Sequence, residues 1–96
     1  GGPYPALFEA IAKVPAAGNP HRVRVRRIGS MLVVDLDIEV APDMSVRSAH
    51  AIAARVENAI KDAIPEIYDV IVHIEPHGNV EDERYGLTAA DTESEE

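Results

Sequence analysis

The stretch HRVRVRRIGSMLVVDLDIEV, residues 21–40, decides the fold of this chain. Before Gly29-Ser30, valine and arginine alternate, and after it apolar and acidic residues alternate, as in strands with one buried face and one exposed face. Gly29-Ser30 itself is a two-residue turn of the kind that begins with glycine. The stretch therefore predicts an antiparallel hairpin. Its register predicts two facing pairs, Arg24 with Asp35 and Arg22 with Asp37.

Apolar residues recur at helical spacing on both sides of this hairpin. They predict a short amphipathic helix over 5–14 and a longer one over 46–64, each ending next to a proline that disfavours further helix. Asp43 or Ser45 is the predicted N-cap of the longer helix. The predicted strands are 21–28, 31–40 and 68–75, the last of which reads YDVIVHIE.

The order helix, strand, strand, helix, strand predicts an α+β fold. A strand–helix–strand crossover is right-handed and returns parallel, so the last strand should lie beside 31–40 in a three-stranded mixed sheet with 31–40 in the centre. Both helices should cover the face to which Leu32, Val34 and Leu36 point. The opposite face of the sheet would carry four polar side chains: Asp35, Asp37, His73 and Glu75.

Composition narrows the function. The chain has 96 residues, a net charge of -8 and no cysteine, which indicates one small domain without disulfides, thiolate nucleophiles or cysteine-based metal centres. An acidic chain lacks the basic face that binding to nucleic acid needs. The motifs GxSxG, GxGxxG, HExxH and the P-loop are missing. We therefore expect a soluble domain that is not an enzyme and does not bind nucleic acid.

The charge is concentrated at the end of the chain. Residues 80–96 contain seven acidic residues and one base, Arg84, and show no hydrophobic periodicity. Such a composition is typical of a disordered segment. The sequence thus predicts a folded domain over 1–79 followed by an acidic disordered tail over 80–96.

A group of possible metal ligands lies on the polar face of the predicted sheet. His73 and Glu75 are two residues apart on one strand and therefore point the same way. Asp35 and Asp37 should lie beside them on the central strand. An imidazole and carboxylates that converge would suit a borderline divalent cation such as zinc, iron or manganese.

The same residues also fit a simpler interpretation. An exposed polar face would hold cross-strand ion pairs between Arg24 and Asp35 and between Arg22 and Asp37, each worth roughly 0.2–1 kcal/mol. Three further histidines have weaker positional signals. His21 begins the first strand on the side of Val23, and His50 lies on the flank of the longer helix. His77 follows the last strand and is the weakest candidate.

Three stretches carry a family resemblance: HRVRVRRIG at 21–29, DMSVRSAHAIAARVENAI at 43–60 and VIVHIEP at 70–76. Together they resemble the cytoplasmic C-terminal domain of cation diffusion facilitator transporters, over roughly residues 5–77. The resemblance implies a metallochaperone-like (ferredoxin-like) αββαβ fold. It also implies a full-length membrane transporter that exports divalent metals, with this domain on the cytoplasmic side of the membrane.

In that family the cytoplasmic domain forms a homodimer, binds divalent metal ions, and couples the metal concentration to the conformation of the transmembrane domain of the same chain. The ligands that the resemblance implies are His21, His50 and His73, with Glu75 in place of an aspartate. Asp37 stands near the position of a further histidine, and Asp35 with His73 matches the pair of the magnetosome-type members. Zinc, iron(II) and manganese remain open, as does a stand-alone α/β interaction or ligand-binding domain without metal.

Overall fold

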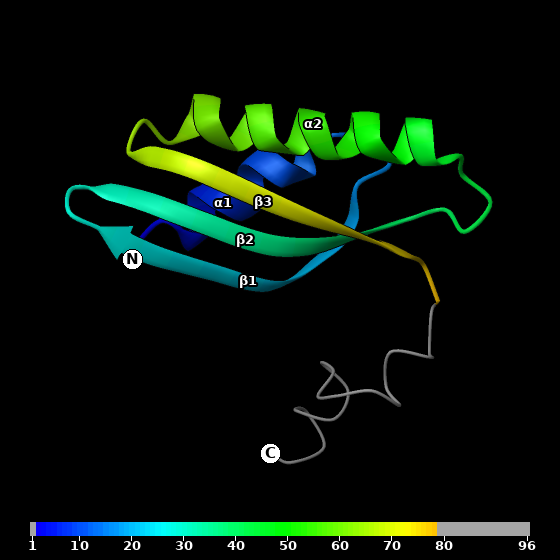
Figure 1. Cartoon of the computed structure of the whole chain (residues 1–96), viewed down its shortest axis with the longest axis horizontal. Helices are drawn as coiled ribbons and strands as arrows, with labels where there is room; N and C mark the ends of the chain where they lie inside the picture. Colours follow the sequence, from blue (N-terminus) through cyan, green and yellow to red (C-terminus); the bar gives the residue numbers. More distant parts are fainter. Residues whose placement is uncertain (1, 79–96) are drawn as a thin grey trace, which may run out of the picture.

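The computed structural model describes residues 2–78, which form a single sheet with two helices (Figure 1). In chain order the elements are α1 (Tyr4–Ala12), β1 (Gly18–Ile28), β2 (Met31–Val40), α2 (Val46–Ala63) and β3 (Ile67–Pro76). The predicted α+β fold and αββαβ order are confirmed. The predicted acidic tail, 80–96, lies outside the described residues.

The sheet is mixed, with strand order β1-β2-β3. β1 pairs antiparallel with β2 through the hairpin, and β3 returns parallel to β2 after α2 crosses over. β2 is therefore the central strand, as predicted. Of the two predicted caps, Ser45 is the one at the start of α2, where its hydroxyl oxygen accepts a hydrogen bond from the backbone N–H of Ser48 at 3.1 Å. Within residues 2–78 no helix combines the length and the apolar character that crossing a membrane requires.

The core lies between one face of the sheet and the two helices. Alternate residues of β2 point into it, because successive side chains of a strand point to opposite faces. The side chains that are almost fully buried come from β2 and both helices: Val34, Leu36, Ile38, Leu7, Ile11, Val56 and Ile60. Burying each contributes roughly 1.5–3 kcal/mol. The other face of the sheet, called the open face below, carries Asp35, Asp37, Glu39, His73 and Glu75.

The predicted register of the hairpin is correct near the turn and wrong further along it. Arg24 lies opposite Asp35 as predicted, but Asp37 lies opposite His21 and not opposite Arg22. Between Arg24 and the start of the strand, β1 contains two register shifts, where it carries extra residues relative to β2. Asn19 and Arg22 have φ of 40° and 51° in these irregular stretches, a conformation often found at bulges.

These bulges change the side of the sheet on which His21 lies. A regular strand would place His21 on the side of Val23, which packs against the core. Because one extra residue reverses the alternation of side chains, His21 instead lies on the open face beside Glu75. The prediction that His21 shares a side with Val23 is therefore wrong, and the bulge at Arg22 is the reason.

Candidate metal centre

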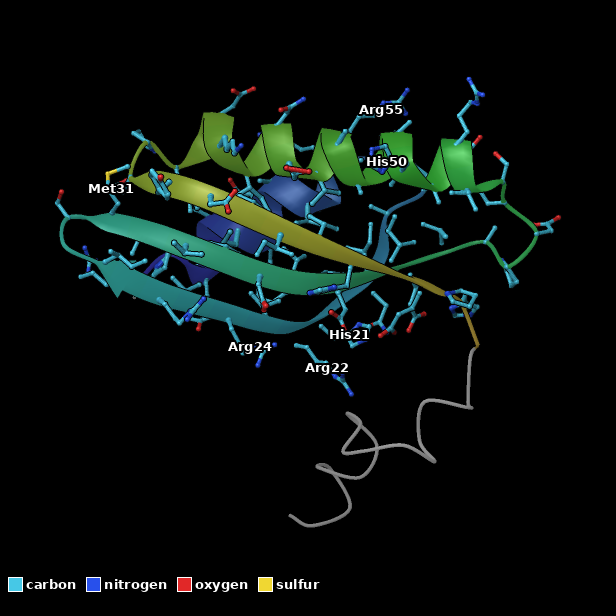
Figure 2. The ribbon with its side chains drawn as sticks, in the orientation of Figure 1. His21, Arg22, Arg24, Met31, His50 and Arg55 are labelled. Carbon is cyan, nitrogen blue, oxygen red and sulfur yellow. The ribbon has the colours of Figure 1, made fainter. Side chains whose placement is uncertain are left out.

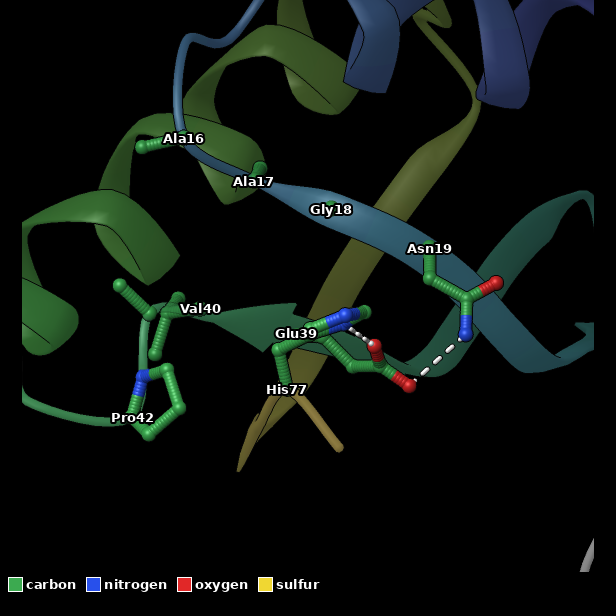
Figure 3. A pocket seen from close by; sticks show the side chains of 9 residues that line it. Ala16, Ala17, Gly18, Asn19, Glu39, Val40, Pro42 and His77 are labelled. Carbon is green, nitrogen blue, oxygen red and sulfur yellow. Dashed lines mark hydrogen bonds and ion pairs between the residues drawn. The ribbon is translucent and has the colours of Figure 1, made fainter. Parts of the chain in front are cut away.

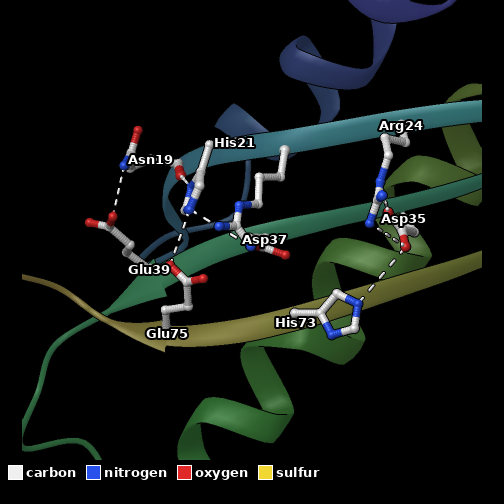
Figure 4. Close-up of polar contacts among 9 residues, drawn as sticks. Asn19, His21, Arg24, Asp35, Asp37, Glu39, His73 and Glu75 are labelled. Atoms are coloured by element: carbon white, nitrogen blue, oxygen red, sulfur yellow. Dashed lines mark hydrogen bonds and ion pairs between the residues drawn. The ribbon is translucent and has the colours of Figure 1, made fainter. Parts of the chain in front are cut away.

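Three side chains from three different strands meet at one end of the open face. His21 of β1, Glu39 of β2 and Glu75 of β3 each offer a ligand atom, and these atoms all lie within 4.8 Å of one another (Figure 4). All three residues are half-buried. We call this group the three-strand cluster. It joins the two edge strands of the sheet across the central one.

The ring of His21 is held in a defined orientation. Its Nδ1 lies 2.7 Å from the backbone carbonyl oxygen of Asn19, and a carbonyl can only accept, so Nδ1 carries the hydrogen. Its Nε2 points at Glu75 Oε1 at 3.1 Å and lies 3.8 Å from Asp37 Oδ2. When the imidazole is neutral, Nε2 is therefore the nitrogen with a free lone pair, directed at carboxylates.

The carboxylate of Glu39 is held on both sides. The Asn19 side-chain amide donates to Oε2 at 2.8 Å, and His77 Nδ1 lies 2.7 Å from Oε1. The hydrogen bond from Asn19, then that with His77, and the positive charge of His77 and His21, together lower the pKa of Glu39 below its ordinary value, against the opposite effect of burial. Glu39 is thus kept in the ionised form that binds a cation.

Asp37 lies directly beside the three-strand cluster. It is 6% exposed, and among the described residues it is the one charged side chain in the buried class. Its Oδ2 lies 3.8 Å from both His21 Nε2 and Arg22 Nη1. A carboxylate removed from water needs such compensating charge. Asp37 therefore adds a further negative charge behind the cluster.

A second, looser group lies further along the open face. His73 Nε2 is 3.9 Å from Asp35 Oδ2, while Arg24 Nε donates to Asp35 Oδ1 at 3.1 Å. The His73 side chain is 54% exposed. Both ion pairs of the simpler interpretation, Arg24 with Asp35 and Arg22 with Asp37, are present. Asp35 thus already has Arg24 as a cationic partner.

Of the six predicted ligands, His21 and Glu75 belong to the three-strand cluster, and Asp37 lies beside it. Asp35 and His73 form the second group. His50 is exposed on α2, whose buried side packs on the face opposite the open face (Figure 2). Within one protomer, His50 therefore belongs to neither group.

Glu39 is not among the ligands predicted from the sequence, and the contacts of Asn19 and His77 were not predicted either. Glu39 continues the alternation that places Asp35 and Asp37 on the polar face, so the pattern itself contained the signal. His77 is close because its backbone N–H donates to the carbonyl of Val40 at 2.8 Å, which extends the pairing of β3 with β2. The contact of Asn19 depends on the bulge in β1.

Two hollows in the described part of the chain border the three-strand cluster and Asp37. One, of about 410 Å³, is lined by polar residues that include Arg22, Asp37, His73 and Glu75. The other, of about 570 Å³, has mostly small and apolar walls and lies on the far side of Glu39, against Val40, Pro42 and His77 (Figure 3). The three-strand cluster is thus reachable from the surface.

The donor set fits a borderline divalent cation. One imidazole nitrogen and two carboxylates are the combination that zinc, iron(II) and manganese accept, and the lack of sulfur disfavours copper(I). The Nδ1–H contact to a backbone carbonyl is the usual second contact of a metal-binding histidine. Chemistry and orientation therefore both suit a metal ion held by these residues.

Comparison with known proteins agrees with this fold. Residues 3–77 match the family model described as the cytoplasmic domain of cation efflux proteins. Metal tolerance protein C1 of Arabidopsis thaliana is 38% identical over 70 residues, which cover 73% of this chain but 15% of that protein. The chain therefore spans only a small part of this relative.

Two solved structures are also similar. The metal-bound C-terminal domain of the CzcD transporter from Thermotoga maritima shares 40% identity with a TM-score of 0.78, over 81% of this chain and 91% of that one. A variant of the MamM C-terminal domain in a copper form shares 27% identity with a TM-score of 0.74, over 77% and 92% of the two chains. These solved domains match nearly along their whole length.

Proposed function

The chain belongs to the family of cytoplasmic domains of cation efflux proteins, and from this premise we propose that it is the metal-sensing, dimer-forming regulatory domain of a membrane transporter that exports divalent cations. The family model describes a cytoplasmic domain. The transmembrane part would belong to the same full-length chain, and transport itself would take place there. This domain would then report the cation concentration on the cytoplasmic side.

The observation that carries the proposal is the convergence of His21, Glu39 and Glu75 within 4.8 Å. Two ionised carboxylates and an oriented imidazole nitrogen repel one another unless a positive charge lies between them. His21, Glu39 and Glu75 would hold a divalent cation, with Asp37 adding negative charge beside it. The cation would supply that positive charge and bridge the three strands.

Regulation would follow from differential affinity. If two copies of the domain adopt more than one mutual arrangement, the arrangement that binds the cation more tightly gains population as the cation concentration rises. On the open face, Ile71 of β3 is an exposed apolar side chain that would be available to such pairing. His50, which lies in neither group of one protomer, would act as a ligand only together with residues of a second copy.

The ligand atoms define a class of metal ions and do not single out one metal. Zinc, iron(II) and manganese are all compatible with nitrogen and oxygen ligands. Asp35 and His73 would form a secondary, weaker position, because Arg24 already pairs with Asp35. The resemblance to the MamM domain and to the CzcD domain supports a metal-binding role for either group.

The test is titration of the metal-free chain with zinc and with manganese, followed by calorimetry, with light scattering for mass and small-angle X-ray scattering for shape. We expect saturable binding, a dimeric mass, and a change in dimensions on binding. His21→Ala should reduce zinc affinity at least tenfold, since it removes the one nitrogen ligand of the three-strand cluster. His50→Ala is the matched control, because it removes an exposed histidine from α2.

Each result has a clear meaning. An unmodified chain that binds neither metal contradicts the proposed function and favours an interaction domain without metal. Equal loss of affinity in both histidine variants would instead indicate one centre shared between two copies. A monomeric mass at all metal concentrations would contradict the dimer-based regulation while leaving metal binding in place.

A further inference from the structure

Asn19 contacts two of the three side chains in the three-strand cluster. Its backbone carbonyl accepts the hydrogen bond from Nδ1 of His21 at 2.7 Å, and its side-chain amide donates to Oε2 of Glu39 at 2.8 Å. The two contacts use different parts of the residue. One residue from β1 therefore orients a nitrogen ligand on its own strand and an oxygen ligand on the next.

The backbone of Asn19 makes the first contact possible. Its φ of 40° lies in the left-handed region, which asparagine tolerates better than most residues other than glycine. The first register shift of β1 lies between Gly18 and His21, which brackets Asn19. This local turn directs the carbonyl of Asn19 toward the ring of His21, only two residues further along the chain.

The second contact determines how Glu39 presents its charge. With Oε2 engaged by the Asn19 amide and Oε1 lying 2.7 Å from His77 Nδ1, the Glu39 carboxylate cannot rotate freely. Asn19 itself is exposed, so its side chain contributes little to the core. The hydrogen bond to Glu39 is therefore the main contribution of the Asn19 side chain to the structure.

We propose that Asn19 is a positioning residue of the metal centre: its carbonyl fixes His21 with Nε2 free to bind, and its amide holds the Glu39 carboxylate in place. The inference rests on the proposed function, since it concerns the same three side chains. Residues that orient metal ligands in this way typically contribute 10–100-fold to affinity. Asn19 would do so without touching the metal.

The decisive variant is Asn19→Gly. Glycine adopts positive φ without strain, so the carbonyl can keep its contact with His21 while the amide to Glu39 is lost. We expect zinc affinity measured by calorimetry to fall 10–100-fold. The midpoint of thermal unfolding of the metal-free chain should stay within a few degrees of the original. Asn58→Ala, which removes an exposed amide from α2, is the matched control and should bind zinc as the unmodified chain does.

A second variant addresses the carbonyl. Asn19→Val places a β-branched residue where φ is positive, which such residues avoid, so the carbonyl should turn away from His21. Long-range proton–nitrogen NMR spectra of the metal-free chain at about pH 8, where free imidazole is neutral, report which ring nitrogen carries the hydrogen. We expect the Nδ1–H form of His21 in the unmodified chain and in Asn19→Gly, and its partial loss in Asn19→Val.

The outcomes separate this inference from the proposed function. If the unmodified chain binds zinc and Asn19→Gly binds it within threefold, the amide has no positioning role and the inference is wrong. If His21 carries its hydrogen on Nε2 in the unmodified chain, the role of the carbonyl is wrong. If the unmodified chain binds neither zinc nor manganese, the proposed function fails and this inference fails with it.

Discussion

His21 and Glu75 are 54 residues apart in the chain, yet Nε2 of the histidine lies 3.1 Å from Oε1 of the glutamate. The contact spans β2, which lies between their strands. A neutral Nε2 and a carboxylate oxygen at this distance would both present lone pairs to each other. A proton on His21 or a cation between the two residues removes this conflict, so proton and cation compete for one place.

This competition predicts that metal binding depends on pH. Because a nitrogen that binds a metal cannot carry a proton, a cation that binds His21 competes with protons, so zinc binding should weaken as the solution becomes more acidic. Calorimetry of zinc binding in two buffers with different ionisation enthalpies measures any protons that the cation displaces. Equal zinc affinity at about pH 7.5 and about pH 5.5 would contradict the assignment of His21 as a ligand.

Glu75→Gln should lower zinc affinity by at least tenfold, because it replaces the carboxylate that faces His21 Nε2 with an amide of the same size. The control is Glu66→Gln, which changes the net charge equally at an exposed position just before β3. Equilibrium dialysis against zinc compares the two. A similar loss in both variants would mean that overall charge, and not the three-strand cluster, determines the affinity.

The stability of the metal-free domain should fall in acid partly because of Glu39. Its pKa is lowered in the folded chain from the ordinary value of 4.5, so its stabilising contribution is present above that value and is lost as the pH falls through the folded pKa. Glu39→Gln lacks this contribution and should show a shallower decline of the free energy of unfolding below about pH 4.5. Urea unfolding over a pH series measures it, with Glu9→Gln on the exposed side of α1 as control. Identical pH profiles for Glu39→Gln and the unmodified chain would refute the role of Glu39.

Ala16→Gly should stabilise the domain by about 0.5–1 kcal/mol. Ala16 is exposed and has a φ of 72°, which costs an L-residue roughly 1–2 kcal/mol and glycine almost nothing, although glycine gains more freedom on unfolding. Ala54→Gly, at an exposed position inside α2, should have the opposite effect and destabilise by about 1 kcal/mol. Chemical unfolding of both variants tests the difference. A destabilised Ala16→Gly would show that the positive φ is not a source of strain.

The fold could be predicted from the sequence because its signals are local. The alternation on either side of Gly29-Ser30, the helical spacing in α2 and the prolines that follow both helices each act within a few residues. The crossover rule then left one simple arrangement of the third strand. The sequence also predicted that Asp43 or Ser45 is the N-cap of α2, and in the structure the N-cap is Ser45.

The site was only partly predictable because it depends on an irregular strand. A perfectly alternating strand would place His21 on the core side and Arg22 opposite Asp37. The two bulges of β1 change this arrangement, and they could not be predicted from the sequence pattern. Once β1 is bulged, His21 reaches Glu75, and Glu39 becomes its neighbour. The position of His50 relative to a second copy depends on how two chains pack together. No local sequence pattern predicts that packing.

The placement of the three-strand cluster across β1, β2 and β3 has a mechanical consequence. A cation held there would act as a staple between the two outer strands, which do not hydrogen-bond to each other, and would close a long loop of chain much as a disulfide does. Without the ion, β1 and β3 could each separate from β2 independently. With the ion bound, they would have to separate together. Local fraying and release of the ion would thus become a single event.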